Sequence, residues 1–156
     1  MKRSYFSLLV LAIVVICTSC AREPQPMAYI TNTSDVAITL YGDREKDSVV
    51  LSPWQRTYIC DVDVIDGKFA GSSGYNWMFS VFTPVTKIKR LDTMYDVPEQ
   101  YQKFLSDINN YIHHTSLGSS SSSPVKLEGS HYDYYLTDEF IEEIIQASEN
   151  ANSNKE

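Results

Sequence analysis

The stretch TYICDVDVIDGKFAG, residues 57–71, has the pattern of a β-hairpin. Apolar side chains alternate with aspartates along its first half, at Cys60, Val62 and Val64 and at Asp61 and Asp63. This two-residue period is typical of a strand with one apolar and one polar face. Asp66-Gly67 follows, and both residues tolerate the positive φ of a two-residue hairpin turn. We therefore expect two antiparallel strands joined at residues 66 and 67.

Similar short segments lie on both sides of the hairpin. Strand patterns occur at residues 28–31, 36–40, 48–52, 77–83, 85–91, 124–129 and 131–137, separated by turn residues such as Pro53. Many short strands with regular turns favour two packed sheets over an alternating α/β fold. The sequence therefore predicts a mainly β protein with some helix, an immunoglobulin-like or related β-sandwich of about seven to eight strands.

Two amphipathic helices are expected in addition to these strands. In residues 95–114, apolar side chains recur at three- and four-residue steps, and Asp96 and Pro98 suit the beginning of a helix. Residues 137–150 begin with the capping residue Thr137 and carry acidic side chains in the first turn, which favours the helix dipole. The intervening serine-rich residues 115–125 are expected to form a loop, and residues 151–156 a flexible tail.

The amino terminus has the pattern of a secretion signal. Lys2 and Arg3 precede an apolar run of about 11 residues, well short of the roughly 20 that a transmembrane helix needs. The ICTSC that follows, residues 16–20, resembles a bacterial lipobox, although Cys17 stands where Leu is commonest. This resemblance implies a diacylglycerol on Cys20, cleavage before it, and membrane anchoring by acyl chains. An ordinary signal peptide with incidental cysteines is the alternative.

These features divide the chain into four parts. We expect a lipoprotein signal peptide at residues 1–19, a tether at 20–27, a single β-sandwich-like domain at 28–150 and the tail at 151–156. The mature chain would have 11 basic and 20 acidic residues. Such a charge opposes binding to nucleic acid and to anionic lipid head groups. The expected membrane contact is therefore the lipid on Cys20 alone. With Cys20 acylated, Cys60 has no partner for an intramolecular disulfide, and its place on an apolar strand face indicates a core residue.

Catalytic and metal-binding motifs are weak in this sequence. Asp61 and Asp63 occupy the first and third positions of a calcium-loop pattern, but the required glycine and the terminal glutamate are missing. These two aspartates remain candidates for cation binding, against the alternative of a solvated acidic face. The imidazoles are His113, His114 and His131, and on a helix the adjacent pair would point in different directions. No nucleophile with a matching base can be identified, and no cofactor is expected.

Aromatic side chains are the remaining functional signal. The chain has 11 tyrosines and two tryptophans, and exposed aromatic groups can stack on sugars or form protein interfaces. Trp54 lies beside a proline in a turn, and Tyr132, Tyr134 and Tyr135 form a group in which the first two share a strand face. These four residues form the candidate ligand or partner surface, with core packing or cross-strand pairing as the competing role.

Taken together, these features resemble the small lipoproteins of Bacteroidetes. The likeness rests on the leader ending in TSC, the segment ITNTSDVAITLYG, residues 30–42, the short strands, and the closing YYLTDEFIEEI, residues 134–144. It implies an outer-membrane lipoprotein. We therefore expect a non-catalytic binding or structural accessory module of the cell envelope, with a glycan or an envelope protein as its partner. The alternative is a small hydrolase or metal-dependent enzyme of the envelope.

Overall fold

The computed structural model describes residues 25–44, 46–73, 79–115 and 129–153. Its longest hairpin is the one that the sequence predicts, formed by β4 (Arg56–Ile65) and β5 (Lys68–Ser73). Asp66 and Gly67 have φ values of 52° and 71°, so both turn residues adopt the left-handed conformation that this dipeptide allows. A bulge between Asp63 and Val64 interrupts the antiparallel register.

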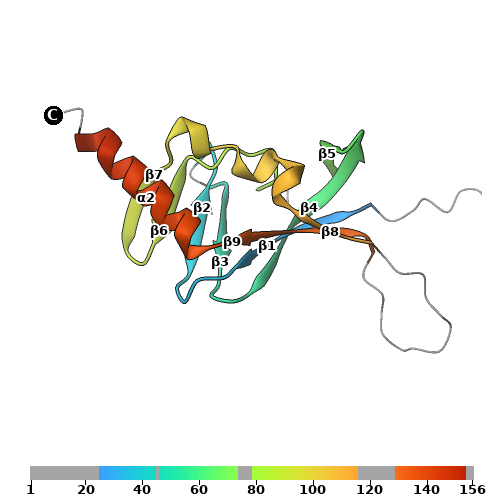
Figure 1. Ribbon diagram of the computed structural model, residues 1–156, viewed down its shortest axis with the longest axis horizontal. Coiled ribbons are helices and arrows are strands. Elements are labelled where there is room, and N and C mark those ends of the chain that lie inside the picture. The colour runs from blue at the N-terminus through green and yellow to red at the C-terminus, as the bar shows by residue number, and fades with distance from the viewer. Residues whose placement is uncertain (1–24, 45, 74–78, 116–128, 154–156) are drawn as a thin grey trace, which may run out of the picture.

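The hairpin belongs to a five-stranded sheet in the order β5-β4-β1-β9-β8. The other three strands are β1 (Met27–Asn32), β8 (Ile112–His114) and β9 (His131–Leu136). β1 lies at the centre, antiparallel to β4 and parallel to β9, whereas β9 is antiparallel to β8. Figure 1 shows the blue β1 and the orange-red β9 side by side, so segments from the two ends of the described chain meet in the middle of this sheet.

A second sheet has four antiparallel strands in the order β3-β2-β6-β7. They are β2 (Ile38–Tyr41), β3 (Ser48–Leu51), β6 (Lys87–Arg90) and β7 (Thr93–Asp96). The buried Asn32 connects the two sheets, because its side-chain amide donates hydrogen bonds to the carbonyls of Val36 and Leu51 at 2.8 and 3.0 Å. Its Oδ1 accepts from the Ser34 backbone N–H and hydroxyl, so both ends of this buried amide are satisfied.

Both sheets contribute to one hydrophobic core. The alternation predicted for the strands is observed, with one side chain of each pair buried and its neighbour facing outward. Fully buried side chains include Ala28, Ile30 and Leu136 from the five-stranded sheet and Ile38, Leu40, Leu51 and Ile88 from the four-stranded sheet. Each buried Ile or Leu contributes about 1.5–3 kcal/mol, so this shared core is the main source of stability.

The predicted carboxy-terminal helix is confirmed. It is α2 (Asp138–Ser153), which continues three residues beyond the expected end. The Thr137 hydroxyl accepts a hydrogen bond from the Phe140 backbone N–H at 3.3 Å, as expected for a capping residue. Ile141, Ile144 and Ile145 form the buried face of the helix. Arg90 of β6 forms ion pairs with Asp138 and Glu142, which connects α2 to the four-stranded sheet (Figure 1).

The helix predicted for residues 95–114 is wrong. This segment contains β7, three single 3-10 turns and β8, the turns being η1 (Glu99–Tyr101), η2 (Phe104–Ser106) and η3 (Ile108–Asn110). The apolar pattern still buries Phe104, Leu105 and Tyr111, because three-residue steps also place side chains on one side of a 3-10 turn. Asp107 separates η2 from η3, since its own backbone is extended and its side chain accepts from the Asn109 backbone N–H at the start of η3.

The mainly β fold with two sheets is confirmed, with nine strands and one α-helix among the described residues. Residues 79–83, in a segment predicted as a strand, form a turn instead. The leader with Cys20, most of the tether, the serine-rich loop and nearly all of the strand predicted at 124–129 lie outside the described residues. Within the described ranges, no helix has the length and apolar character needed to span a membrane.

Candidate functional site

The outer face of the five-stranded sheet carries a cluster of charged and aromatic side chains. Strand alternation turns Ala28 and Ile30 into the core and Tyr29 outward. The parallel register places Asp133 of β9 beside Tyr29, so Asp133 also lies on the outer face. Only 4% of Asp133 is exposed, because neighbouring side chains cover it. A buried carboxylate needs such partners to offset its loss of hydration.

Arg56 of β4 is the first of these partners. Its Nε donates to Asp133 Oδ1 at 2.6 Å, and its Nη2 donates to Oδ2 at 3.2 Å, which gives a bidentate ion pair. The guanidinium carbon lies 3.6 Å from the centre of the Tyr29 ring, in cation-π geometry. Arg56 and Tyr29 thus cover Asp133 from the strands on one side of β9.

Two imidazoles cover Asp133 from the other side. His131 lies two residues before Asp133 on the same face of β9, and the antiparallel register pairs it with His114 of β8. The Nε2 atoms of His114 and His131 lie 3.3 and 3.4 Å from Asp133 Oδ2. The two rings stack with their centroids 4.7 Å apart. The three side chains therefore bring their donor atoms within 4.8 Å of one another.

The orientation of His131 determines which nitrogen faces Asp133. Its Nδ1 lies 3.1 Å from the backbone carbonyl of Gly129. A carbonyl oxygen can only accept a hydrogen bond, so Nδ1 carries the proton in this contact. In the neutral imidazole the lone pair is then on Nε2, the atom that faces Asp133 Oδ2. Two acceptor atoms at this distance need either a second ring proton or a cation between them.

His113 lies on the opposite face of β8. It stacks on Tyr132, with centroids 4.4 Å apart and ring planes within 10°, and its Nε2 is 2.7 Å from the Ser130 hydroxyl. The prediction that His113 and His114 point in different directions is therefore confirmed, although a strand separates them instead of a helix. Strand alternation leaves only His114 of this pair in the cluster.

Asp61 and Asp63, the aspartates considered for cation binding, do not join the imidazoles in the described structure. Asp61 Oδ1 accepts a hydrogen bond from the Tyr58 hydroxyl at 2.9 Å, and Asp63 Oδ1 accepts from the Gln25 amide at 2.6 Å. Burial and the contact with Asp61 raise the pKa of Tyr58 well above its usual value, which keeps this hydroxyl protonated as a donor. Each carboxylate thus has a separate hydrogen-bond partner.

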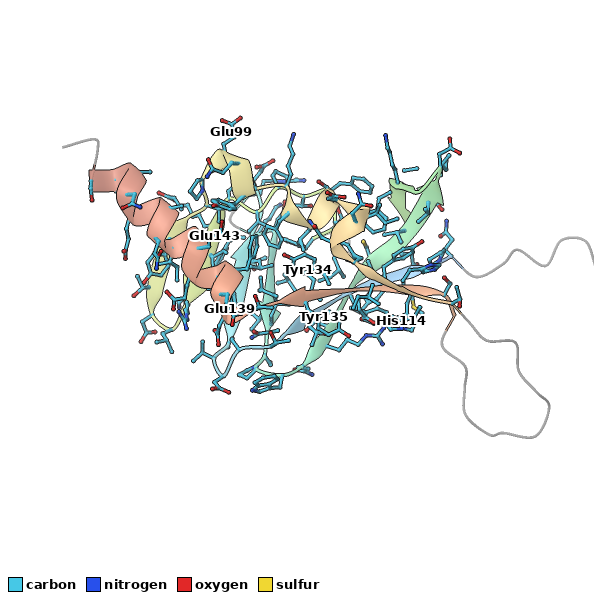
Figure 2. All side chains as sticks on the ribbon, in the orientation of Figure 1. Glu99, His114, Tyr134, Tyr135, Glu139 and Glu143 are labelled. Atoms are coloured by element: carbon cyan, nitrogen blue, oxygen red, sulfur yellow. The ribbon has the colours of Figure 1, made fainter. Side chains whose placement is uncertain are left out.

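The four aromatic candidates divide between the surface and the core. Trp54 is 67% exposed with a φ of 54°, and its indole N–H donates to Asp35 at 2.9 Å. Tyr132 and Tyr134 are buried in the core, which agrees with the competing packing role. Burial raises the pKa of both tyrosines. Tyr135 is 43% exposed, and Figure 2 shows it and Tyr134 on opposite sides of β9.

Tyr135 borders a shallow hollow of about 330 Å³ at the edge of the five-stranded sheet. The hollow lies beyond the three residues of β9 that pair with β8. Its lining is aromatic with a few polar groups, and consists of Phe104, Asn110, Tyr134, Tyr135, Thr137 and Phe140. Phe104 packs edge-on against Phe140 and tilted against Tyr134, with centroids 5.2 and 5.4 Å apart. The floor of the hollow is therefore fixed by core packing.

Cys60 is the one free thiol in the described structure and is buried. Burial raises its pKa, which disfavours the thiolate that nucleophilic chemistry requires. The chain matches no protein-family model, and no curated protein or solved structure is significantly similar to it.

Sequence reasoning missed the cluster around Asp133. The signal was His131-x-Asp133, because residues two apart in a strand share a face. His114 and Arg56 join them only through strand pairing, since they lie 19 and 77 residues before Asp133 in sequence. The first pair could have been found from the pattern, whereas the complete cluster required the sheet register.

Proposed function

We propose that this protein is a non-catalytic binding module of the cell envelope, held at the outer membrane by a lipid on Cys20. Three features support this proposal: the lipobox-like residues 16–20, the acidic composition and the aromatic hollow beside Tyr135. The hollow is the expected binding site for the ligand. Its ligand is a glycan, because an exposed tyrosine ring can stack on the apolar face of a sugar while Asn110 and Thr137 offer polar groups at the rim.

The geometry of the hollow suits weak, selective binding. Tyr135 projects from β9 at the rim, while Tyr134 and Phe104 are held in the core below it. A binding surface that is formed before the ligand arrives loses little conformational freedom on association. An envelope protein that inserts an aromatic side chain here is the other partner compatible with this lining.

The test of binding compares two exposed aromatic residues. Tyr135→Ala removes the ring at the hollow, and Phe82→Ala removes a ring with 42% exposure on a separate turn. Glycan-array screening of the full chain should give hits that Tyr135→Ala loses by at least tenfold in affinity and Phe82→Ala retains. Hits that survive Tyr135→Ala, or an array without hits, would contradict the glycan proposal. Circular dichroism checks that both variants are folded.

The anchor has its own test, which is independent of glycan binding. Mass spectrometry of the protein expressed in a diderm bacterium should show an amino terminus at Cys20 carrying acyl chains. Cys20→Ser should abolish the added mass and release the protein from the membrane fraction. A wild-type chain that begins at another residue would refute the lipoprotein proposal.

A metal-dependent hydrolase is the second candidate function, and the cluster of His114, His131 and Asp133 favours it. Three protein ligands with an open position are typical of catalytic zinc sites. Arg56 opposes this function, because its guanidinium occupies both oxygens of Asp133 and adds a positive charge beside the site. Screening the zinc-loaded protein against esters, peptides and phosphoesters would separate the two functions, since turnover that requires His114 favours the hydrolase.

A further inference from the structure

We propose that His114, His131 and Asp133 form a binding site for a divalent transition-metal ion such as Zn²⁺. Two imidazole nitrogens and one carboxylate oxygen are donors that suit zinc and its neighbours, whereas calcium and magnesium prefer all-oxygen sites. The proposal concerns the outer face of the five-stranded sheet. It is independent of glycan binding at the hollow beside Tyr135.

Two of the three distances between donor atoms agree with tetrahedral coordination, and all three donor atoms lie within 4.8 Å of one another. Zinc lies about 2.0–2.1 Å from its nitrogen and oxygen ligands, so two ligand atoms of a tetrahedral site are roughly 3.3 Å apart. The Nε2 atoms of His114 and His131 lie 3.3 and 3.4 Å from Asp133 Oδ2. His114 is 44% exposed on the short edge strand β8, so it is the ligand that can adjust when the ion enters.

The environment of His131 is that of a metal ligand. Its Nδ1–H donates to the Gly129 carbonyl, which fixes the ring and turns Nε2 toward Asp133. Metal-binding histidines commonly use their second nitrogen in this way. An ion between Nε2 of the neutral ring and Asp133 Oδ2 would form two coordination bonds where a second ring proton would otherwise be needed.

Arg56 positions the carboxylate. Each Asp133 oxygen accepts one hydrogen bond from Arg56 and keeps a second lone pair, and Oδ2, the oxygen in contact with both imidazoles, offers its lone pair to the ion. The positive charge of Arg56 also repels a dication, so we expect weaker binding than in a closed structural zinc site. A fourth coordination position is left for water or for a donor atom of a partner.

Isothermal titration calorimetry with zinc chloride tests this proposal. The full chain is purified without a histidine tag and stripped with EDTA. We expect one ion per chain, with affinity reduced at least tenfold in His114→Gln and in His131→Gln. His113→Gln is the matched control, because this adjacent imidazole faces away from the cluster and should leave zinc affinity within about twofold of wild type.

Cobalt gives a second readout that does not depend on heat. Co²⁺ should produce the visible absorption of a nitrogen- and oxygen-ligated ion in wild type and in His113→Gln, and much weaker absorption in His114→Gln. His114 is exposed enough that its substitution should not unfold the chain, which circular dichroism checks. Absence of zinc binding in wild type, retention of wild-type affinity in His114→Gln, or equal loss in His113→Gln and His114→Gln would each overturn the proposal.

Discussion

Arg56→Met should destabilise the fold markedly, because it leaves the Asp133 carboxylate buried without its main partner. The side chain of Asp133 is 6% exposed and that of Arg56 is 30% exposed. Removing one member of a buried ion pair forces the other to remain charged in a poorly hydrated environment. The apolar Met side chain keeps much of the volume of Arg56, so the lost ion pair is the principal change.

The magnitude follows from the contacts that disappear. Two charge-assisted hydrogen bonds, at 2.6 and 3.2 Å, contribute about 1.5–3 kcal/mol each. The cation-π contact with Tyr29 adds about 0.5–1 kcal/mol. Since Arg56 is partly exposed, water can reach the carboxylate after substitution, and we take the lower end of the sum. The expected loss in the free energy of unfolding is about 3.5 kcal/mol, within the roughly 3–5 kcal/mol of broken buried pairs.

Urea unfolding followed by circular dichroism, in buffer with EDTA, measures this loss. Arg90→Met is the matched control, because Arg90 pairs with Asp138 and Glu142, whose side chains are 46% and 49% exposed, and such pairs contribute about 0.2–1 kcal/mol. The double variant Arg56→Met with Asp133→Leu should recover most of the loss, since no charge is then buried. If Arg56→Met costs no more than Arg90→Met, or if the double variant is less stable than either single one, the reasoning is refuted.

Two further predictions concern the core. Asn32→Ala removes the amide that donates to the Val36 and Leu51 carbonyls. It should lower the free energy of unfolding, measured by urea titration, by about 2–4 kcal/mol. A loss under about 1 kcal/mol would contradict the role of Asn32 in connecting the two sheets. Burial raises the pKa of Tyr111 and Tyr134 above the usual 10.0, so the folded state retains these protons when the unfolded state has lost them. Stability contributed in this way is complete below pH 10 and declines as the pH rises above it, so equilibrium unfolding at pH 9 and pH 11 should show a lower urea midpoint at pH 11. An equal midpoint at both pH values would argue against buried, protonated phenols.

Local chemistry was sufficient to predict the β4–β5 hairpin and α2. Asp66-Gly67 specifies a left-handed turn, and the alternation before it leaves one choice of buried face. In α2, the Thr137 cap and the apolar residues at helical spacing indicate the same beginning and the same inner face. Each of these signals lies within one segment, so no distant contact was needed to interpret it.

Residues 95–114 could not be interpreted in the same way. Their apolar spacing fits a helix and a series of 3-10 turns equally well, and Asp107 and Asn109 provide local hydrogen bonds that compete with helix continuation. The segment must also deliver Ile112–His114 to the edge of the sheet as β8, which is a long-range requirement. Strand pairing between β8 and β9 therefore determines the structure of this segment, although its apolar spacing favours a helix.

The cluster around Asp133 was beyond local reasoning for a similar reason. His131 and Asp133 are two residues apart, but Arg56 and His114 are placed beside them by β4–β1–β9 and β8–β9 pairing. Asp61 and Asp63 fit the first and third positions of a calcium-loop pattern, yet each has a separate partner. The spacing His131-x-Asp133 indicates one carboxylate–imidazole pair, whereas the other two members of the cluster depend on the sheet register.

The parallel pairing of β1 with β9 has a consequence for when this protein can fold. β1 begins at Met27 and its partner ends at Leu136, so the centre of the five-stranded sheet closes only after more than 100 residues of intervening chain are present. Long loops must be closed before such a contact contributes, which slows folding relative to proteins built from local hairpins. A nascent chain, whether emerging from a ribosome or threaded amino terminus first through a translocation pore, would therefore lack the β1–β9 pair until β9 has also emerged.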